Sequence, residues 1–388
     1  MAMDPAAATK AYIDGLGAAE LAKSRAYTTG NEWLMLADLV VAAIIAFLIV
    51  RSGVLDKAFG KLAQRGRFVR TFLVGALYLL FSAVLTLPWS IYTGWWRELQ
   101  YGMTSQPLGD FLAQSGIALV IAALVGGLLI VGLYALIRRT GRLWWAWSGA
   151  LVAAVIAFML LLSPVLIEPL FNEFEPVPEG EVRDAVLVLS REAGIPDDRV
   201  FVYDGSRQSN NFTANVAGLG PNKRVAISDV ALGEASLDEV RAVTGHEIGH
   251  YVLGHVWMRV LVFAGLSVLV FFLVARLYPR AARLFGTDAP IEDVRGLPVF
   301  AFVATLLFAL ATPLVNAVIR MGESQADDYS LEHVNLPDGL ASALVKTAEF
   351  RYPRSGPVEE MLFYTHPSVE KRVLNAMEWK AANRPAGE

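Results

Sequence analysis

Two histidines and a glutamate stand together at 246–250 in the order His-Glu-Ile-Gly-His. Side chains four residues apart face the same way on an α-helix, so His246 and His250 can reach one metal ion. Glu247, between them, can approach a metal-bound water as a general base. This spacing is typical of zinc metalloproteases. The motif therefore predicts an enzyme that holds one Zn²⁺ per chain.

A catalytic zinc ion takes three protein ligands and keeps one coordination position open. The chain has no cysteine, so the third ligand must be histidine, glutamate or aspartate. Glu323 and Asp327 are also spaced four residues apart, in a segment expected to be helical. We assign Glu323 as the third ligand. Asp327, one turn further on, is placed to accept a hydrogen bond from the free N–H of a ligand imidazole.

The remaining histidines have less distinctive surroundings. His255 follows His250 by five residues, which on a continuing helix would rotate it off the ligand face, so we predict a surface or packing role. His333 is predicted to be structural. His366 lies next to Pro367, with Arg372 six residues later. Both can reach the site from the C-terminal part of the chain, but the residues alone leave a structural role open.

Local patterns predict the elements that position this site. Ser236 and Glu239 have the spacing of a capping box, which would begin the helix that carries His246. Periodicity predicts another helix over 179–193. Strands are expected near 199–204, 213–217 and 223–228, with a turn at Gly218, Gly220 and Pro221.

The composition indicates a membrane protein. Of 388 residues, 55% are hydrophobic and 18% are charged, against about 25% charged in soluble proteins. This apolar content excludes disorder, and a net charge of −4 argues against nucleic acid as a partner. Six apolar segments are near or above the length that spans a bilayer, and tryptophans gather at segment ends. They are Trp33–Val50, Thr71–Tyr92, Ala113–Ile137, Leu143–Leu166, Val260–Leu277 and Leu297–Val318.

The expected fold is mainly α: a multi-pass membrane helix bundle with an α+β zinc protease domain that carries a small sheet. We expect a polar N-terminal segment, two groups of membrane helices, and a protease domain in two parts. The boundaries are 1–32 for the N-terminal segment, 33–167 for four membrane helices, 168–257 for the first protease part, 258–318 for two membrane helices, and 319–388 for the second protease part.

Several short motifs occur in an order that resembles one known family, the CAAX prenyl protease 1 family of integral-membrane zinc endopeptidases. They begin with Leu87-Pro88-Trp89-Ser90-Ile91-Tyr92 and Pro176-Val177-Pro178-Glu179-Gly180. His246–His250 followed by Leu253-Gly254-His255 comes next. Glu323 with Ala326-Asp327, and then His366-Pro367 with Arg372, complete the series. The resemblance covers most of the chain.

This resemblance implies a barrel of membrane helices around a water-filled chamber, capped by a gluzincin-like zinc domain. It implies His246, His250 and Glu323 as ligands and Glu247 as the catalytic base. It also implies that His366 and Arg372 contact the substrate or the transition state. The family reaction removes the last three residues after a prenylated cysteine, so the expected partners are membrane lipid and a peptide or protein substrate, with or without a prenyl group.

The chain departs from the family pattern at two places. Eukaryotic members have seven membrane segments, whereas six are counted here. The family also has Asn-Ala-Tyr on its substrate-binding strand, where this chain has Thr213, Ala214 and Asn215. Strand addition of a peptide uses main-chain groups, so a backbone role for these three residues is still expected.

Two arguments about membrane orientation conflict. Thirteen basic residues lie in 51–70, 138–142 and 276–295, on one side of a six-span arrangement. The positive-inside rule makes that side cytoplasmic and places the catalytic parts on the other side. The family resemblance implies a cytoplasmic site. In a bacterium, the membrane would be the inner membrane.

Three alternative functions stay open. One is a quality-control protease of the same family without prenyl dependence. Another is an intramembrane metalloprotease, for which the run Asn335-Leu-Pro337-Asp338-Gly339 is a faint signal, although charges near the start of the zinc helix are costly in lipid. The third is a non-catalytic channel or scaffold with a structural zinc, which would need four protein ligands.

Overall fold

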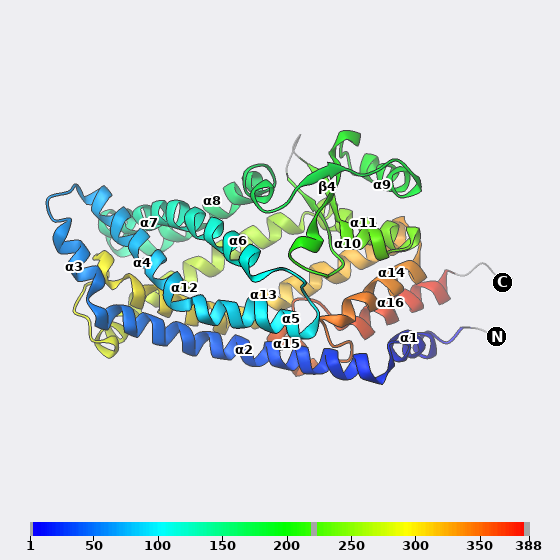
Figure 1. Ribbon diagram of the computed structural model, residues 1–388, viewed down its shortest axis with the longest axis horizontal. Helices are drawn as coiled ribbons and strands as arrows, with labels where there is room; N and C mark the ends of the chain where they lie inside the picture. Colours follow the sequence, from blue (N-terminus) through cyan, green and yellow to red (C-terminus); the bar gives the residue numbers. More distant parts are fainter. Residues whose placement is uncertain (1–2, 219–222, 384–388) are drawn as a thin grey trace.

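The computed structural model describes residues 3–218 and 223–383, and it is dominated by long helices that lie side by side (Figure 1). Within the described residues, six helical stretches are long and apolar enough to cross a membrane. This confirms the predicted number of segments. The six stretches are Gly17–Ser52, Arg67–Tyr101, Leu108–Arg139, Gly141–Leu160, His255–Phe285 and Val294–His333.

Each of these stretches is built from one or more helices. In the second and third stretches, two α-helices are joined by a single π-helical turn, Tyr92–Trp96 and Ala122–Gly126, so the helix continues without a break. The helices are α2 (Gly17–Ser52), α4 (Arg67–Ile91) with α5 (Arg97–Tyr101), α6 (Leu108–Ile121) with α7 (Gly127–Arg139), α8 (Trp144–Leu162), α12 (His255–Phe285) and α13 (Leu297–His333). The short helix α3 (Val54–Lys61) lies at the end of the bundle far from the β-sheet (Figure 1).

The polar N-terminal segment is helical, and the helix that forms the first candidate span begins within it. α1 (Pro5–Asp14) is capped by the Asp4 side chain, and α2 begins at Gly17, well before the apolar stretch expected from Trp33. Alanine has the highest helix propensity, which accounts for order in this polar, Ala-rich stretch. The fully buried Ile13 anchors α1 in a core shared with α14 (Pro337–Lys346) and α16 (Val369–Ala382).

A four-stranded sheet, in the order β1-β2-β4-β3, contacts the helix that carries the His-Glu-Ile-Gly-His run through β3. β2 and β4 are parallel, whereas β1 and β3 join the two edges in antiparallel orientation. The three predicted strands are confirmed as β2 (Val200–Tyr203), β3 (Ala214–Ala217) and β4 (Arg224–Ser228), and β1 (Phe174–Pro176) was not foreseen. β4 is buried along its whole length, while β3 is an edge strand. Gly220 and Pro221 of the predicted turn lie outside the described residues.

Helix α11 (Leu237–Val252), which carries the His-Glu-Ile-Gly-His run, begins where the capping box predicted. The Ser236 side chain accepts a hydrogen bond from the Glu239 backbone, and the Glu239 carboxylate accepts one from the Ser236 backbone. α11 packs against α9 (Glu181–Glu192), α13 and α14. α10 (Asp229–Glu234) leads into it, and α15 (Pro357–Phe363) precedes α16 at the C-terminal end.

α13 runs without a break from its apolar stretch to the segment that packs against α11. The last predicted membrane segment ended at Val318, yet the helix continues to His333 and carries Glu323 and Asp327 on its extension. Because α11 packs on this extension, residues far apart in sequence face one another there. The mainly helical fold with a small mixed sheet is the predicted fold class.

Candidate metal centre

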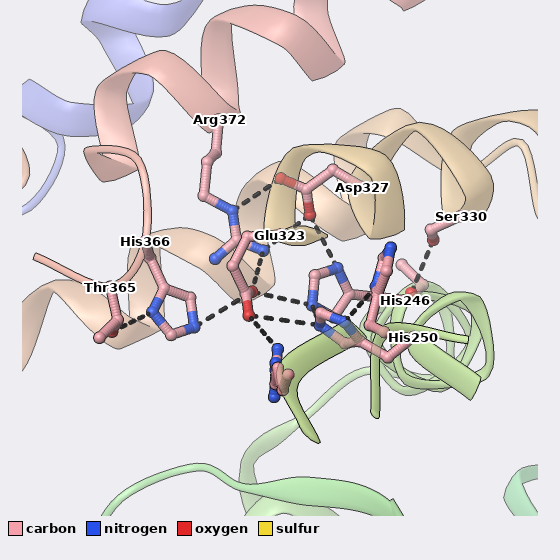
Figure 2. Close-up of polar contacts among 11 residues, drawn as sticks. His246, His250, Glu323, Asp327, Ser330, Thr365, His366 and Arg372 are labelled. Carbon is pink, nitrogen blue, oxygen red and sulfur yellow. Dashed lines mark hydrogen bonds and ion pairs between the residues drawn. The ribbon is translucent and has the colours of Figure 1, made fainter. Parts of the chain in front are cut away.

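Three side chains from α11 and α13 converge on one point (Figure 2). Nε2 of His246 lies 3.1 Å from Nε2 of His250. Oε2 of Glu323 lies 3.3 Å from Nε2 of His246, and Oε1 of Glu323 lies 3.3 Å from Nε2 of His250. These are the three ligands predicted from the sequence.

These distances fit a metal ion in a tetrahedral site. Ligand atoms about 2.0–2.1 Å from a tetrahedral zinc ion are separated by about 3.3 Å. The Glu323 Oε2 atom is buried and receives no well-aligned hydrogen bond from the described residues, although Nε2 of His366 is 3.1 Å away, and burying a carboxylate oxygen in this state is costly. A cation between the two imidazoles and this carboxylate would satisfy it. Two nitrogens and one oxygen are donors that Zn²⁺ accepts.

Asp327 supports the first ligand from behind. Its Oδ1 atom lies 2.9 Å from Nδ1 of His246, so Nε2 of that imidazole is left to face the metal position. Nε and Nη2 of Arg372 each donate a hydrogen bond of 2.7 Å to the two carboxylate oxygens of Asp327. All three side chains are buried. The ion pair therefore holds Asp327, and Asp327 in turn orients His246 (Figure 2).

His255 supports the second ligand, contrary to the predicted surface or packing role. It is only 2% exposed, and its Nδ1 atom lies 2.8 Å from Nδ1 of His250. The prediction assumed that α11 continues through His255. Instead α11 ends at Val252, Gly254 adopts a φ of 70°, and α12 begins at His255 in a new direction. The turn brings the His255 ring back against His250. His333, by contrast, stacks on Tyr329, as its structural assignment predicted.

His366 approaches from the loop before α16. Its Nε2 atom lies 3.1 Å from Oε2 of Glu323, and its Nδ1 atom is 2.9 Å from the hydroxyl of Thr365. Burial lowers the pKa of His366 to about 4, in spite of the neighbouring Glu323 carboxylate. The imidazole is therefore neutral near pH 7. When the Thr365 hydroxyl donates to Nδ1, Nε2 carries the ring hydrogen and points toward the site.

Glu247 shares a cavity of about 390 Å³ with the ligands, His366 and Arg372. Among the described residues, none donates a hydrogen bond to its carboxylate. Burial raises the pKa of Glu247 to about 7, a shift that the nearby His246 opposes. A carboxyl group with a pKa near neutrality is suited to accept and return a proton.

The predicted substrate-binding residues lie beside this cavity, though not all of them line it. Thr213 and Ala214 are in its wall, whereas Asn215 is not. The Thr213 hydroxyl is 2.7 Å from the hydroxyl of Tyr203. β3 continues from Ala214 along the open edge of the sheet.

The cavity also contains two arginines that the sequence reading did not single out. Nη2 of Arg259 lies 3.4 Å from Oε1 of Glu323, and Arg351 stands in the wall next to His366. Arg259 comes four residues after His255, at the start of a membrane helix. The sequence shows Arg259 as a charged residue at the end of an apolar segment, but this position does not indicate whether its side chain points toward the metal-binding cluster.

Two of the alternative functions disagree with this geometry. An intramembrane protease would need Asp338 near the metal, but Asp338 is 2.7 Å from Nζ of Lys380 and 3.0 Å from the Tyr12 hydroxyl, outside the ligand cluster. A structural zinc needs four ligands. Within residues 3–218 and 223–383, the group of close metal-binding side chains has three members, which leaves a position open.

Comparison with known proteins extends over nearly the whole chain. Residues 176–380 match the model of peptidase family M48. Residues 5–173 match a family described as the CAAX prenyl protease N-terminal region with five membrane helices. Over that second range, the described residues contain four candidate spans.

Individual relatives show the same similarity. The chain is 28% identical to the "Uncharacterized metalloprotease YhfN" of Bacillus subtilis, over 92% of this chain and 85% of that protein. It is 26% identical to a CAAX prenyl protease 1 homolog of Arabidopsis thaliana, over 94% of this chain and 89% of the relative. The crystal structure of S. mikatae Ste24p superposes with a TM-score of 0.75 at 23% identity, over 92% of this chain and 88% of that one.

A multi-pass helix bundle with a two-histidine, one-glutamate metal cluster defines an integral-membrane metalloprotease. The match to its model over more than half of the residues shows that the chain belongs to peptidase family M48. The resemblance seen in the sequence motifs is thereby confirmed.

Proposed function

We propose that this protein is a zinc endopeptidase that hydrolyses a peptide bond with Glu247 as general base. The observation that carries this proposal is the position of the Glu247 carboxylate. It faces the same cavity as His246, His250 and Glu323 and has no hydrogen-bond donor among the described residues. Zinc, when bound, polarises the scissile carbonyl and lowers the pKa of a water in the open coordination position.

Glu247 acts as the proton carrier in this scheme. It accepts a proton from the attacking water and later delivers that proton to the leaving amine. A pKa raised toward neutrality by burial favours both transfers. Because Glu247 lies between the two histidines on α11, its distance from the reacting atoms is set by the same helix that positions the ligands.

His366 and Arg372 are proposed to stabilise charge on the substrate. The Nε2–H group of neutral His366 points toward the site and can donate to the oxyanion. Two nitrogens of Arg372 are engaged by Asp327, and its Nη1 atom has no hydrogen-bond partner among the described residues. Nη1 is therefore available for a substrate carbonyl.

The peptide is proposed to bind as an additional strand along β3. The Thr213 carbonyl accepts a hydrogen bond from the Ser228 backbone, so the main-chain groups of Thr213 point toward β4. Main-chain groups alternate along a strand, and those of Ala214 and Val216 therefore face the open edge. A peptide added at this edge pairs with the backbone and needs no particular side chain at Thr213.

A cavity at the far end of β3 favours a substrate that carries a large apolar group. A mostly apolar cavity of about 750 Å³ is lined there by Val216, Ala217, Tyr251, Trp257 and residues of α8. A peptide that runs from the metal centre along β3 would bring an apolar group to this cavity. We propose a prenyl group as the occupant, because the relatives include named CAAX prenyl proteases.

Cleavage of a farnesylated CAAX peptide, compared with the same peptide without lipid, tests this proposal. The expected result is release of the C-terminal tripeptide, with a KM at least tenfold lower for the lipidated substrate. Glu247→Gln should abolish cleavage and retain zinc, since the three ligands are unchanged. Full activity of Glu247→Gln would refute the mechanism. Equal cleavage of both peptides would instead favour a quality-control protease.

A further inference from the structure

A cavity of about 320 Å³ is lined by Phe59 of α3 together with residues of α4 and α7. α3 lies at the end of the bundle opposite the sheet and α11 (Figure 1). Three arginines from two helices meet in its wall: Arg67 and Arg70 at the start of α4, and Arg138 at the end of α7. Thr71 supplies a hydroxyl beside them, 3.3 Å from Nη1 of Arg138. The cavity therefore gathers cations from segments almost 70 residues apart in the sequence.

These three positive charges are not neutralised within the protein. No described residue places a carboxylate within 4.0 Å of Arg67, Arg70 or Arg138. Arg70 lies over the ring of Phe59, and Nε of Arg138 donates to the main-chain oxygen of Glu292. Two of the arginines also stand in the first turn of α4, where the helix dipole is already positive.

Two acidic side chains in the cavity wall reduce its excess of positive charge but do not neutralise it. Asp293 is engaged by Arg295, at 2.7 Å between Oδ2 and Nη2. Glu292 is exposed, and its main chain, not its carboxylate, contacts Arg138. Three guanidinium groups that share one cavity suit an anion with several acceptor oxygens, and a phosphate group has this geometry.

The surroundings indicate where such a phosphate comes from. Phe68, Val69 and Leu73 lie beside the arginines on α4, and each is more than 40% exposed. They belong to a stretch that is apolar enough to span a membrane. A ligand bound here would thus place its charged group against the arginines and the adjoining part of the same molecule against apolar side chains. That combination matches a phospholipid at the membrane surface and does not match a free ion.

We propose that Arg67, Arg70 and Arg138 form a binding site for the phosphate headgroup of an anionic phospholipid, on the membrane face opposite the protease part. The acyl chains lie along Phe68, Val69 and Leu73. This site is separate from the metal centre, and its occupation does not depend on the peptidase reaction.

Native mass spectrometry of the full chain in detergent tests the site, with phosphatidylglycerol, phosphatidylcholine and inorganic phosphate as probes. The wild type should bind one phosphatidylglycerol more tightly than phosphatidylcholine. The double variant Arg67→Gln/Arg138→Gln should weaken phosphatidylglycerol binding about thirtyfold, at about fivefold for each arginine. Arg280→Gln/Arg283→Gln is the matched control, since it removes two exposed charges from the same end outside the cavity.

An unchanged affinity in the cavity variant, or an equal loss in the control, would overturn the proposal, because either result would assign binding to general surface charge. Inorganic phosphate that binds as tightly as the lipid would overturn the lipid assignment. If the double variant does not fold, as judged by its thermal midpoint, Arg67→Gln alone replaces it. Arg67 is exposed and has no side-chain hydrogen bond among the described residues, so this variant should fold and lose about fivefold in affinity.

Discussion

His250 and His255 face each other through their Nδ1 atoms at a distance of 2.8 Å. As a ligand in the proposed zinc site, His250 would present the lone pair of Nε2 to the metal, and its Nδ1 atom would then carry the hydrogen and donate to His255. Nε2 of His255 then donates to Oε1 of Gln325, at 2.9 Å. One set of ring tautomers satisfies the whole chain of contacts, so His255 orients His250 as Asp327 orients His246.

Replacing His255 should weaken the metal site without removing a ligand. His255→Ala leaves Nδ1 of His250 without an acceptor, and loss of such a supporting group typically costs about 10–100-fold in metal affinity. Peptide cleavage should fall at limiting zinc and return at excess zinc. Zinc titration followed by peptidase activity measures this. His333→Gln, which alters a histidine stacked on Tyr329, is the control. A loss of activity that excess zinc does not restore would contradict the supporting role.

Replacing only one partner of the buried ion pair between Asp327 and Arg372 should destabilise the protein. Asp327→Leu removes both hydrogen bonds of the buried Arg372 side chain and leaves only the more distant Glu323 carboxylate, at 4.0 Å, so it should destabilise the protein by about 3–5 kcal/mol. Asp327→Leu/Arg372→Met removes both charges and should recover most of that stability. Thermal unfolding in detergent compares the two. Both variants should still bind zinc more weakly than the wild type, because His246 has lost its acceptor. Normal zinc affinity in the double variant would refute this account of Asp327.

Removal of the metal should abolish cleavage reversibly. Dialysis against a chelator is expected to take out one zinc ion per chain together with all peptidase activity, and added Zn²⁺ should restore both. Glu323→Gln should fail to regain either, because a neutral amide is a poor third ligand beside two imidazoles. Metal analysis alongside peptide cleavage measures the outcome. Activity that persists in fully metal-free protein would exclude the proposed mechanism.

The capping box of α11 should make stability depend on acid pH. Burial acts to raise the pKa of Glu239, but Lys346, Ser342 and the Ser236 backbone N–H outweigh it, so the pKa lies below its ordinary value of 4.5. A lowered folded-state pKa means that ionised Glu239 stabilises the fold above about pH 4.5, and that this contribution disappears as the pH falls below that value.

Glu239→Gln should therefore unfold more easily than the wild type at pH 7, by about 1.5–3 kcal/mol for the lost charged hydrogen bonds. The difference between the two proteins should shrink as the pH is lowered below 4.5. Thermal midpoints recorded from pH 7 to pH 4 test this. A difference that stays constant with pH would show that the side-chain charge is not what stabilises the start of α11.

The orientation in the membrane can be decided by reporter fusions. Thirteen basic residues in 51–70, 138–142 and 276–295 predict that this end of the bundle is cytoplasmic. A reporter that is active only outside the cytoplasm should then be active when fused after the C-terminus and inactive when inserted in 51–70. The reverse pattern would favour the cytoplasmic catalytic side that the family resemblance implies.

Helical periodicity made much of the site predictable. His246 with His250, and Glu323 with Asp327, are pairs four residues apart, so each pair had to share a helix face wherever the helix lay. The capping box at Ser236 marked the start of α11, because a helix must satisfy its first N–H groups locally. Apolar segments long enough to span a bilayer gave the six candidate spans. These features depend on residues within one continuous segment of the chain.

The remaining contacts were decided by packing between distant segments. Asp327 meets Arg372 across 45 residues, and Glu323 meets His250 across 73, distances along the chain that no local pattern constrains. His255 was misjudged because the turn at Gly254 redirected the chain, although a continuing helix would have turned the ring away. The arginine cavity at the opposite end likewise joins α4 to α7. The sequence by itself determined the candidate ligands and the candidate spans. Only the tertiary structure determined which side chains contact those candidate ligands, and which arginines meet without a carboxylate partner among the described residues.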